Sequence, residues 1–173
     1  MPTIDQHQIA EAITAWGHAI LEGDDGRELA VVGLISHGDA LARRLVAALA
    51  TAGCHARYGA LDISLYRDDL CSLSHRPALR SSYLPFSTDG MRLVLADDVL
   101  QTGRTVRAAL NAIFDYGRPA TVELHWLVDR GGRELPIQPD YAAFTLEPPV
   151  DDVRVHLCET DGEDAIIISE SKP

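Results

Sequence analysis

Leu93 to Thr105 reads LVLADDVLQTGRT, and this stretch decides the fold. It begins with an apolar run long enough for a buried strand, continues into two carboxylates, and then enters a short turn with Thr and Gly. Residues 106–114, which follow, carry apolar side chains at helical spacing. A strand that leads through a polar turn into a helix is typical of an open α/β sheet. Because such sheets bind ligands at the carboxyl ends of their strands, the turn predicts a binding site.

The residue types in this turn fit a sugar phosphate. The start of the helix offers unpaired backbone N–H groups and a favourable dipole for a phosphate. Gly103 allows the backbone to approach the phosphate closely, and the hydroxyls of Thr102 and Thr105 can donate to its oxygens. Asp97 and Asp98 would repel a phosphate, but they suit the two neighbouring hydroxyls of a ribose. The pattern therefore indicates a pocket for a ribose 5-phosphate.

Two other interpretations of the carboxylate pair stay open from the residues alone. Two Asp residues after a strand also occur as a helix cap or in a solvated loop. They could instead belong to a metal site beside a nucleotide. The chain has no G-x-x-x-x-G-K-[ST] motif, however, so a P-loop nucleoside triphosphatase would lack its phosphate cradle.

Composition limits the class of protein. A length of 173 residues with 46% hydrophobic content predicts one folded domain. No apolar run approaches the roughly 20 residues that cross a bilayer, and residues 1–5 do not start a secretion signal, so we expect a cytoplasmic protein with no membrane contact. The 3 cysteines are scattered and are expected to be reduced thiols. The net charge of −11 disfavours nucleic-acid binding, because phosphate contacts supply most of that affinity.

The order of apolar runs predicts the architecture. We expect helices at 9–21, 41–49 and 106–114, and strands at 29–35, 57–64 and 121–128 in addition to the strand that opens the quoted stretch. Residues 66–90 form a long polar stretch, which is often a lid over a site, although a plain insertion or an extra hairpin would have the same composition. The runs 153–157 and 165–169 flank Asp161-Gly162 and predict a hairpin. Strands alternating with helices, followed by a small β appendage, indicate an α/β protein with a parallel sheet.

Three strings are specific enough to indicate a family. They read GALDISLYRDDL at 59–70, TGRTVRAAL at 102–110 and LVDRGGRELPI at 127–137. Through these strings the chain resembles, from about His18 to Asp164, the pyrimidine-operon attenuator/uracil phosphoribosyltransferase family (PyrR). The resemblance implies a single domain of residues 1–173 with a parallel-sheet type I phosphoribosyltransferase core, helices on both faces of the sheet and a small β hood. We expect the core at about 28–128, the lid loop at 66–90 and the hood and tail at 129–169.

The same resemblance implies an activity and partners. The reaction would convert uracil and phosphoribosyl pyrophosphate (PRPP) to UMP and pyrophosphate. Mg²⁺ would be carried in with PRPP, and the chain would form a homo-oligomer, a dimer or higher. A second role, UMP-dependent binding of leader RNA, would regulate expression of the pyrimidine biosynthesis operon.

The resemblance also assigns site residues, none of them to a metal. Asp97 and Asp98 would be catalytic and hold the ribose hydroxyls. The phosphate would be wrapped by Val99, Leu100, Gln101, Thr102, Gly103, Arg104 and Thr105. Pyrophosphate would meet Ser36, His37 and Gly38, together with Arg67 at the base of the lid. Arg130 falls where the base and the hood meet, and Val153 would line the nucleotide pocket. The residues alone leave another interpretation for the two arginines, namely ion pairs with acids such as Asp68, Asp69 or Glu134.

Several positions depart from the family pattern. Ile35 and His37 stand where the pyrophosphate loop usually carries basic residues, so we expect a weaker or pH-dependent affinity for pyrophosphate. Ala15 stands where an Arg is typical, Gly132 where a His is usual, and 142–149 replaces a Gly-Lys and a Pro-Thr-Ser stretch. Because the family uses such positions for RNA, we predict that RNA attenuation is reduced or absent.

Two other functions stay open. An intact PRPP stretch beside an altered pyrophosphate loop would also fit a regulatory protein that senses UMP or PRPP, turns over little, and binds leader RNA or another partner. A phosphoribosyltransferase for a different base is disfavoured by the string at 128–137, because the hood sets the choice of base.

Overall fold

The computed structural model describes residues 3–67, 81–146 and 152–169. Its elements are β1 (Thr3–Ile4), α1 (Gln6–Glu22), β2 (Leu29–Leu34), α2 (His37–Thr51), β3 (Ala56–Leu61), the 3₁₀ turn η1 (Ser64–Tyr66), β4 (Arg92–Leu100), α3 (Arg104–Ile113), the 3₁₀ turn η2 (Phe114–Tyr116), β5 (Thr121–Asp129), β6 (Tyr141–Thr145), β7 (Asp152–His156), α4 (Cys158–Asp161) and β8 (Ala165–Ser169). Within the described ranges, no helix has the length and apolar character to cross a membrane.

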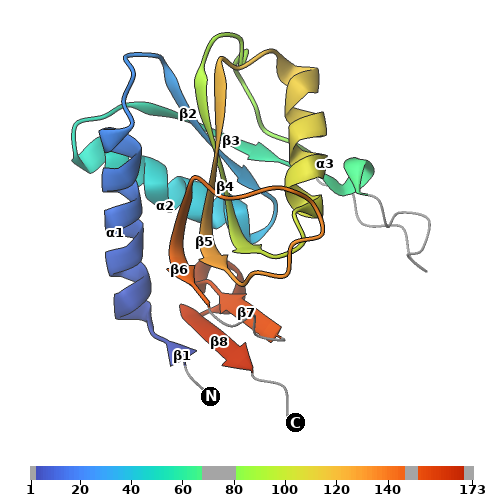
Figure 1. Cartoon of the computed structure of the whole chain (residues 1–173). Helices are drawn as coiled ribbons and strands as arrows, with labels where there is room; N and C mark the ends of the chain where they lie inside the picture. Colours follow the sequence, from blue (N-terminus) through green and yellow to red (C-terminus); the bar gives the residue numbers. More distant parts are fainter. Residues whose placement is uncertain (1–2, 68–80, 147–151, 170–173) are drawn as a thin grey trace.

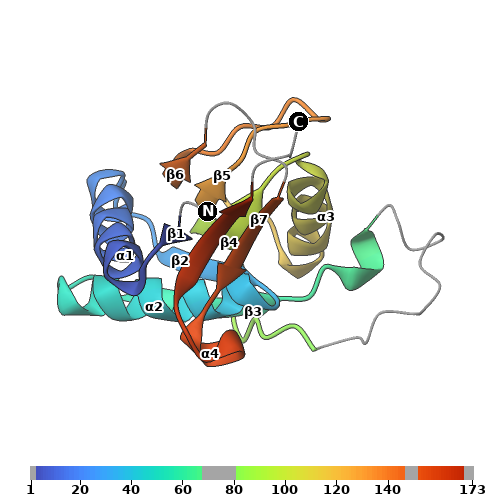
Figure 2. The same cartoon turned by 90° about the horizontal axis from the view of Figure 1, so that it is seen from below.

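A five-stranded sheet in the order β3-β2-β4-β5-β6 forms the centre of the molecule (Figure 1). All four neighbouring pairs are parallel, which confirms the predicted fold class. Helices α1 and α2 lie on one face of this sheet and α3 lies on the other (Figure 2). Parallel sheets need this cover because both of their faces are apolar.

Alternation along β4 explains how one strand supports both layers. Val94 and Ala96 belong to the core cluster that contains the buried residues of α1 and α2. Leu93 and Leu95 belong to the second cluster, which contains the buried face of α3. Successive side chains of a strand point to opposite faces, so a continuous apolar run is what a doubly covered strand requires.

Helix α1 begins where its sequence places a cap. The Asp5 carboxylate accepts the backbone N–H groups of His7 at 2.9 Å and Gln8 at 3.0 Å, while the Gln8 side chain accepts the backbone N–H of Asp5 at 3.1 Å. This reciprocal capping satisfies N–H groups that the first turn leaves unpaired. The helix thus starts at Gln6, three residues before the first apolar residue of the predicted pattern.

The hairpin predicted at the end of the chain is present, with two additions. Strands β7 and β8 pair antiparallel, and the short helix α4 precedes the Gly162 turn that connects them. Strand β1 then adds to the other edge of β8, so the chain's first strand completes this small sheet. Strand β6, in the part of the chain expected as hood and tail, instead pairs parallel with β5 in the central sheet.

The expected lid loop is described only at its two ends. Residues 68–80 lie outside the described ranges. At the far end, Tyr83 exchanges backbone hydrogen bonds with Ala60 of β3, at 2.7 and 2.8 Å. A lid at 66–90 stays a prediction.

The strand order creates a crevice between β2 and β4. These strands are neighbours, but the helix that follows β2 and the helix that follows β4 lie on opposite faces of the sheet. The two connections therefore separate at the carboxyl ends of the strands. Open α/β sheets bind ligands at such a switch point.

Candidate active site

Two adjoining pockets occupy this crevice. The first has a volume of about 340 Å³ and is lined by Arg67 and by 99–105. The second has a volume of about 260 Å³ and is lined by Leu34, Ile35, Ser36, His37, Ile63, Arg67, Asp97, Asp98, Val99 and Thr105. Arg67, Val99 and Thr105 line both, so the pockets form one continuous site. The structure thereby brings together nearly all of the predicted site residues.

The first pocket is the turn between β4 and α3. Gly103 caps α3 with φ = 88°, a left-handed conformation that favours glycine, and no side chain caps the helix. The backbone N–H of Arg104 donates to Oγ1 of Thr102 at 3.2 Å. Gly103 itself supplies no capping side chain, so the other N–H groups of the first turn and the helix dipole are available to an anion.

Arg133 fixes this turn from outside the pocket. Its guanidinium donates to the carbonyl oxygens of Gln101 at 2.9 Å and Ile137 at 2.8 Å, and to the Asp129 carboxylate at 2.6 Å. The carbonyl of Thr102 accepts two further N–H groups, from Glu134 and Leu135. The segment after β5 therefore supports the turn, which the sequence analysis did not anticipate.

The two carboxylates at the end of β4 have different surroundings. Asp97 is 9% exposed, and burial, followed by the repulsion of Asp98, raises its pKa well above the usual value. Asp98 is half-buried; its Oδ1 accepts the N–H of Val99 at 2.7 Å and its Oδ2 lies 3.0 Å from Nδ1 of His37. Burial therefore favours the neutral form of Asp97, whereas Asp98 is held by a backbone N–H and by an imidazole.

The second pocket is closed by the start of α2. Gly38 lies so close to β4 that a Cβ added there would be 2.5 Å from the carbonyl oxygen of Ala96 and 2.9 Å from Oδ1 of Asp97. Ser36 caps the helix without a side-chain hydrogen bond. The first turn of α2 therefore packs directly against the end of β4, and only a glycine fits at position 38.

His37 lies between carboxylates from two directions. Its Nδ1 is 3.0 Å from Asp98, and its Nε2 is 3.0 Å from Oδ2 of Asp161. The hydrogen bond to Asp98, aided by Asp161, raises the pKa of His37 to about 9, although burial opposes the shift. The loss of permanent charge expected from a His at this position is therefore largely reversed at neutral pH.

Not every predicted residue lines the pockets. Gly38, Arg130 and Val153 are absent from the described lining of both. The Arg130 backbone N–H donates to the carbonyl of Leu100 at 3.0 Å, and Val153 is buried in the core of the molecule. Glu134, one of the acids considered as an arginine partner, pairs with Arg104 at 2.7 Å. Their roles toward a ligand stay predictions.

Comparison with known proteins gives the family. The family described as "Phosphoribosyl transferase domain" matches residues 3–159. The "Bifunctional protein PyrR" of Akkermansia muciniphila is 56% identical over 165 residues, which cover 95% of this chain and 93% of that protein. The protein of the same name from Deinococcus radiodurans is 45% identical over 166 residues, 94% of this chain and 91% of that one.

Solved structures show the same fold at low identity. A hypoxanthine-guanine phosphoribosyltransferase from Bacillus anthracis aligns with a TM-score of 0.72 and 14% identity over 98% of both chains. The hypoxanthine phosphoribosyltransferase of Trypanosoma cruzi aligns with a TM-score of 0.70 and 18% identity, covering 97% of this chain and 95% of that one.

These matches confirm the family that the three sequence strings indicate and the type I phosphoribosyltransferase fold expected from it. The chain belongs to the phosphoribosyl transferase family and, within it, to the PyrR proteins, and it is a phosphoribosyltransferase.

Proposed function

We propose that the chain transfers the 5-phosphoribosyl group of PRPP to uracil, releasing UMP and pyrophosphate, and that it also regulates pyrimidine biosynthesis. The observation that carries the transferase proposal is the continuous crevice in which the 99–105 turn, the two carboxylates and the start of α2 line adjoining pockets. This crevice has an anion-binding helix start at each end and hydrogen-bond acceptors between them. PRPP has the same order of groups: a 5-phosphate, a ribose and a diphosphate.

In this proposal each part of the crevice holds one part of PRPP. The uncapped first turn of α3 and the hydroxyls of Thr102 and Thr105 donate to the 5-phosphate. Asp98 accepts from a ribose hydroxyl, while Asp97, whose pKa burial raises, can also donate in its neutral form. Ser36, His37 and Arg67 face the diphosphate, and Gly38 belongs to the same helix start.

The reaction needs no covalent nucleophile. Departure of pyrophosphate from C1 of the ribose builds positive charge on the sugar ring. The nitrogen of uracil then forms the new bond to C1 and loses its proton, which the departing pyrophosphate or water accepts. The Asp98 carboxylate lies in the pocket proposed for the ribose and stabilises that charge electrostatically. Donors at the start of α2 stabilise the negative charge that develops on the leaving group.

Mg²⁺ fits this site as a companion of the substrate. Within 3–67, 81–146 and 152–169, no group of three or more His, Cys, Asp or Glu side chains could hold a metal ion by itself. The diphosphate oxygens of PRPP and water would supply the ligands that such a hard cation prefers. When bound, the ion would neutralise charge on the leaving pyrophosphate.

A uracil assay tests the transferase proposal. We expect UMP from uracil, PRPP and Mg²⁺, measured beside other pyrimidine and purine bases. The double variant Asp97→Asn with Asp98→Asn should lose activity by about a thousandfold, since electrostatic stabilisation and ribose contacts worth about 4 kcal/mol in total are weakened together. Asp152→Asn, whose carboxylate pairs with Arg154 at the surface, is the matched control and should keep the activity. Full activity in the double variant would refute the proposed site.

A sensor with little turnover is the second candidate. The observation that favours it is the engagement of both ring nitrogens of His37 by carboxylates, which leaves neither directed at pyrophosphate. Calorimetry that detects UMP binding in a protein without measurable turnover would select this function over the transferase.

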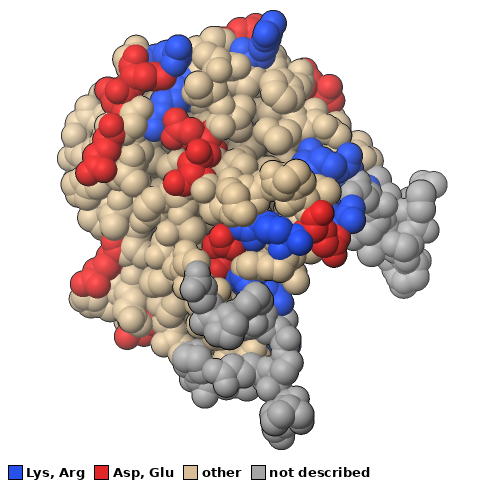
Figure 3. Space-filling view, in the orientation of Figure 1, with Lys and Arg blue, Asp and Glu red and all other residues tan. Residues whose placement is uncertain are grey.

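We propose that RNA binding is weak or absent and that regulation acts through another partner. Acidic side chains lie beside arginines across the face in Figure 3. Arg43 pairs with Asp39, Arg57 with Glu28 and Arg154 with Asp152, so these cations are already compensated. Together with the net charge of −11, this leaves little attraction for a phosphate backbone. A gel-shift titration with pyrimidine leader RNA and UMP tests this, and sub-micromolar UMP-stimulated binding would contradict it.

We also propose a homo-oligomer, a dimer or higher, as the resemblance to the family implies. Light scattering coupled to size-exclusion chromatography measures the mass directly, and a monomer at micromolar concentration would contradict the proposal.

A further inference from the structure

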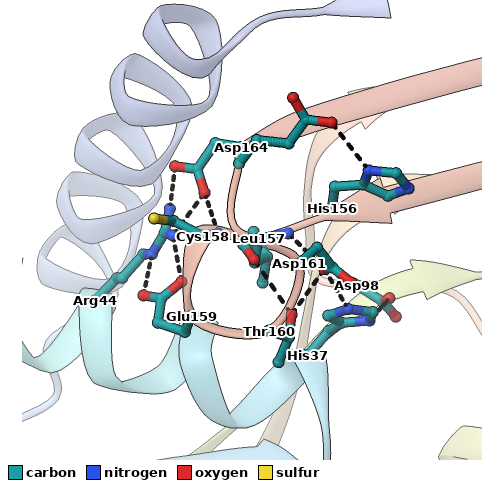
Figure 4. A network of polar contacts seen from close by, with 11 residues as sticks. His37, Arg44, Asp98, His156, Leu157, Cys158, Glu159, Thr160, Asp161 and Asp164 are labelled. Carbon is teal, nitrogen blue, oxygen red and sulfur yellow. Dashed lines mark hydrogen bonds and ion pairs between the residues drawn. The ribbon is translucent and has the colours of Figure 1, made fainter.

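A chain of polar contacts connects the C-terminal hairpin to the proposed ribose site (Figure 4). His37 lies in its centre, with Nδ1 3.0 Å from Oδ2 of Asp98 and Nε2 3.0 Å from Oδ2 of Asp161. The three residues come from α2, β4 and α4, and Asp161 is 124 positions away from His37. From the sequence, Asp161 is expected only as part of a turn.

Asp161 is held in place independently of His37. Its carboxylate accepts the backbone N–H of Leu157 at 2.9 Å and the hydroxyl of Thr160 at 2.7 Å. These contacts lie within α4 and the residue that precedes it. The position of this carboxylate is therefore set by its own segment before it meets the imidazole.

Arg44 in turn fixes α4 against α2. Its guanidinium donates to Oε1 of Glu159 at 2.8 Å and to both oxygens of Asp164 at 2.7 Å. Arg44 and His37 lie on the same helix, so the ion pairs of Arg44 hold the segment that carries Asp161 close to the imidazole of His37.

Two carboxylates on one imidazole determine which hydrogen bonds it can make. A neutral imidazole has one N–H, so it can donate to only one of the two acids, whereas the doubly protonated ring donates to both. The pKa of His37 is raised to about 9 by Asp98 first and Asp161 second. The other ionisable groups that line its pocket are Arg67 and Asp97, and burial raises the pKa of Asp97. Nδ1 therefore donates to Asp98 while Asp161 occupies Nε2.

We propose that Asp161 is a positioning residue of the transferase, which acts through His37 to hold the Asp98 carboxylate in the orientation that binds the ribose of PRPP. The proposal rests on the function proposed above for Asp98. Oδ1 of Asp98 is already fixed by the N–H of Val99 at 2.7 Å, so the bond from His37 sets the other oxygen and hence the plane of the group. Asp161 fixes the donor of that bond and does not itself line either described pocket.

The test removes the negative charge of Asp161 and keeps an oxygen that can accept the backbone N–H of Leu157. In Asp161→Asn the amide oxygen can still accept the N–H of Leu157; should that variant fail to fold, Asp161→Ser keeps a capping oxygen and carries the same expectations. Glu163→Gln is the control, because this carboxylate belongs to the same segment but meets His156 at the surface. Thr160→Val removes a contact within α4 and leaves Asp161 facing His37.

Three measurements are made on the full-length protein. NMR titration of the His37 imidazole should give a pKa about one unit lower in Asp161→Asn than in the parent protein, and an unchanged one in the control. Calorimetry should give a Kd for PRPP raised about fivefold, and kinetics should show the same rise in KM for PRPP, with KM for uracil and kcat within about twofold. Thr160→Val removes one of the two contacts that hold Asp161, so it should shift these values in the same direction but by less than Asp161→Asn does.

A double-mutant cycle decides whether the effect passes through His37. In a His37→Gln background, Asp161→Asn should add no further loss of PRPP affinity, because the intermediate group is gone. An additive loss would overturn the proposal, as would a PRPP affinity that stays constant while the pKa of His37 falls. A tighter PRPP complex would also overturn it, since Asp161 would then compete with pyrophosphate for the ring. Because calorimetry does not need turnover, PRPP binding without UMP formation refutes the proposed reaction alone, and absence of PRPP binding refutes both.

Discussion

Gly38→Ala tests the close approach on which the second pocket depends. Gly38 lies in the first turn of α2, where a Cβ would meet the carbonyl oxygen of Ala96 at 2.5 Å, Oδ1 of Asp97 at 2.9 Å and Cα of Asp97 at 3.2 Å. Two of these three atoms are backbone atoms of a strand that pairs with neighbours on both sides. Such a strand cannot give way as the end of a flexible side chain would, so the helix start must move instead.

The expected loss follows from two opposing contributions. Replacing Gly by Ala inside a helix stabilises the folded state by about 1 kcal/mol, because the unfolded chain loses freedom. Forcing a methyl group into a packed site costs about 1–3 kcal/mol, and contact with backbone favours the upper end. We therefore expect a net loss of about 2 kcal/mol in the free energy of unfolding. For a domain of this size that corresponds to a Tm lower by about 4–8 °C.

The matched control is the same substitution in another helix. Gly17 is buried in α1, but a Cβ there would meet only the Cβ of Ala48, at an ordinary 3.6 Å. Gly17→Ala should therefore stabilise the protein by up to about 1 kcal/mol. Urea unfolding compares the two variants, and calorimetry with PRPP should show weakened binding only for Gly38→Ala, because the displaced turn carries Ser36 and His37. Equal stability of the two variants, or unchanged PRPP affinity in Gly38→Ala, would refute the reasoning.

Three further predictions concern charge and buried polar groups. The pKa of His37 is raised from 6.5 to about 9 in the folded state, so its protonation stabilises the protein fully below pH 6.5, and this contribution is lost as the pH rises through 9. Because the side chain is 26% exposed, we expect a contribution of about 1–2 kcal/mol. Urea unfolding of the parent protein and of His37→Gln at pH 6 and pH 10 measures it, and a stability difference that does not change with pH would contradict the prediction. Arg44→Met leaves two carboxylates of the C-terminal hairpin without their cation and should cost about 2 kcal/mol, with hydrogen exchange accelerated in β7 and β8 but not in β4. Trp16→Phe removes the N–H that donates to Nδ1 of buried His125 at 2.8 Å and should cost about 2 kcal/mol in urea unfolding, whereas a cost below about 0.5 kcal/mol would mean that His125 finds another donor.

The central layers could be predicted because their signals are local. The apolar run that becomes β4, the run that becomes β2 and the run that becomes β5 are bounded by turn residues, and each is long enough for a buried strand. The helical pattern of α3 follows its strand directly. Local patterns of this kind specify which elements form, and their alternation specifies a parallel sheet.

One edge strand of each sheet carried no such signal. Strand β6 reads YAAFT and is half-buried along most of its length, so it shows neither a continuous apolar run nor a clean alternation. Strand β1 has two residues, and it becomes a strand only because β8, more than 160 positions later, offers a free edge. Pairing over such distances depends on the assembled fold, which a window of sequence does not contain.

The candidate site divides in the same way. The turn at 99–105 and the adjacent acids were found because they are contiguous, and the loop at 36–38 was found through the family resemblance. The raised pKa of Asp97 and the contact of Asp98 with His37 were not predicted, because they depend on burial and on a histidine from another element. Asp161 was missed for the same physical reason: its turn is local, but its contact with His37 exists only after the hairpin packs on α2.

The distribution of charge explains how a chain with a net charge of −11 can hold a polyanion. Several arginines are engaged by carboxylates, such as Arg44 and Arg133, which fix the segments around the crevice. The crevice itself offers helix starts, backbone N–H groups and hydroxyls, whose fields act over a few ångströms and do not depend on the net charge. Short-range donors bind a small phosphate ester that enters the crevice, but they cannot attract an extended phosphate backbone from solution. We therefore expect raised ionic strength to weaken PRPP binding only modestly. A steep salt dependence would show that arginines of the pocket lining, such as Arg67 and Arg104, supply more of the affinity than the helix starts do.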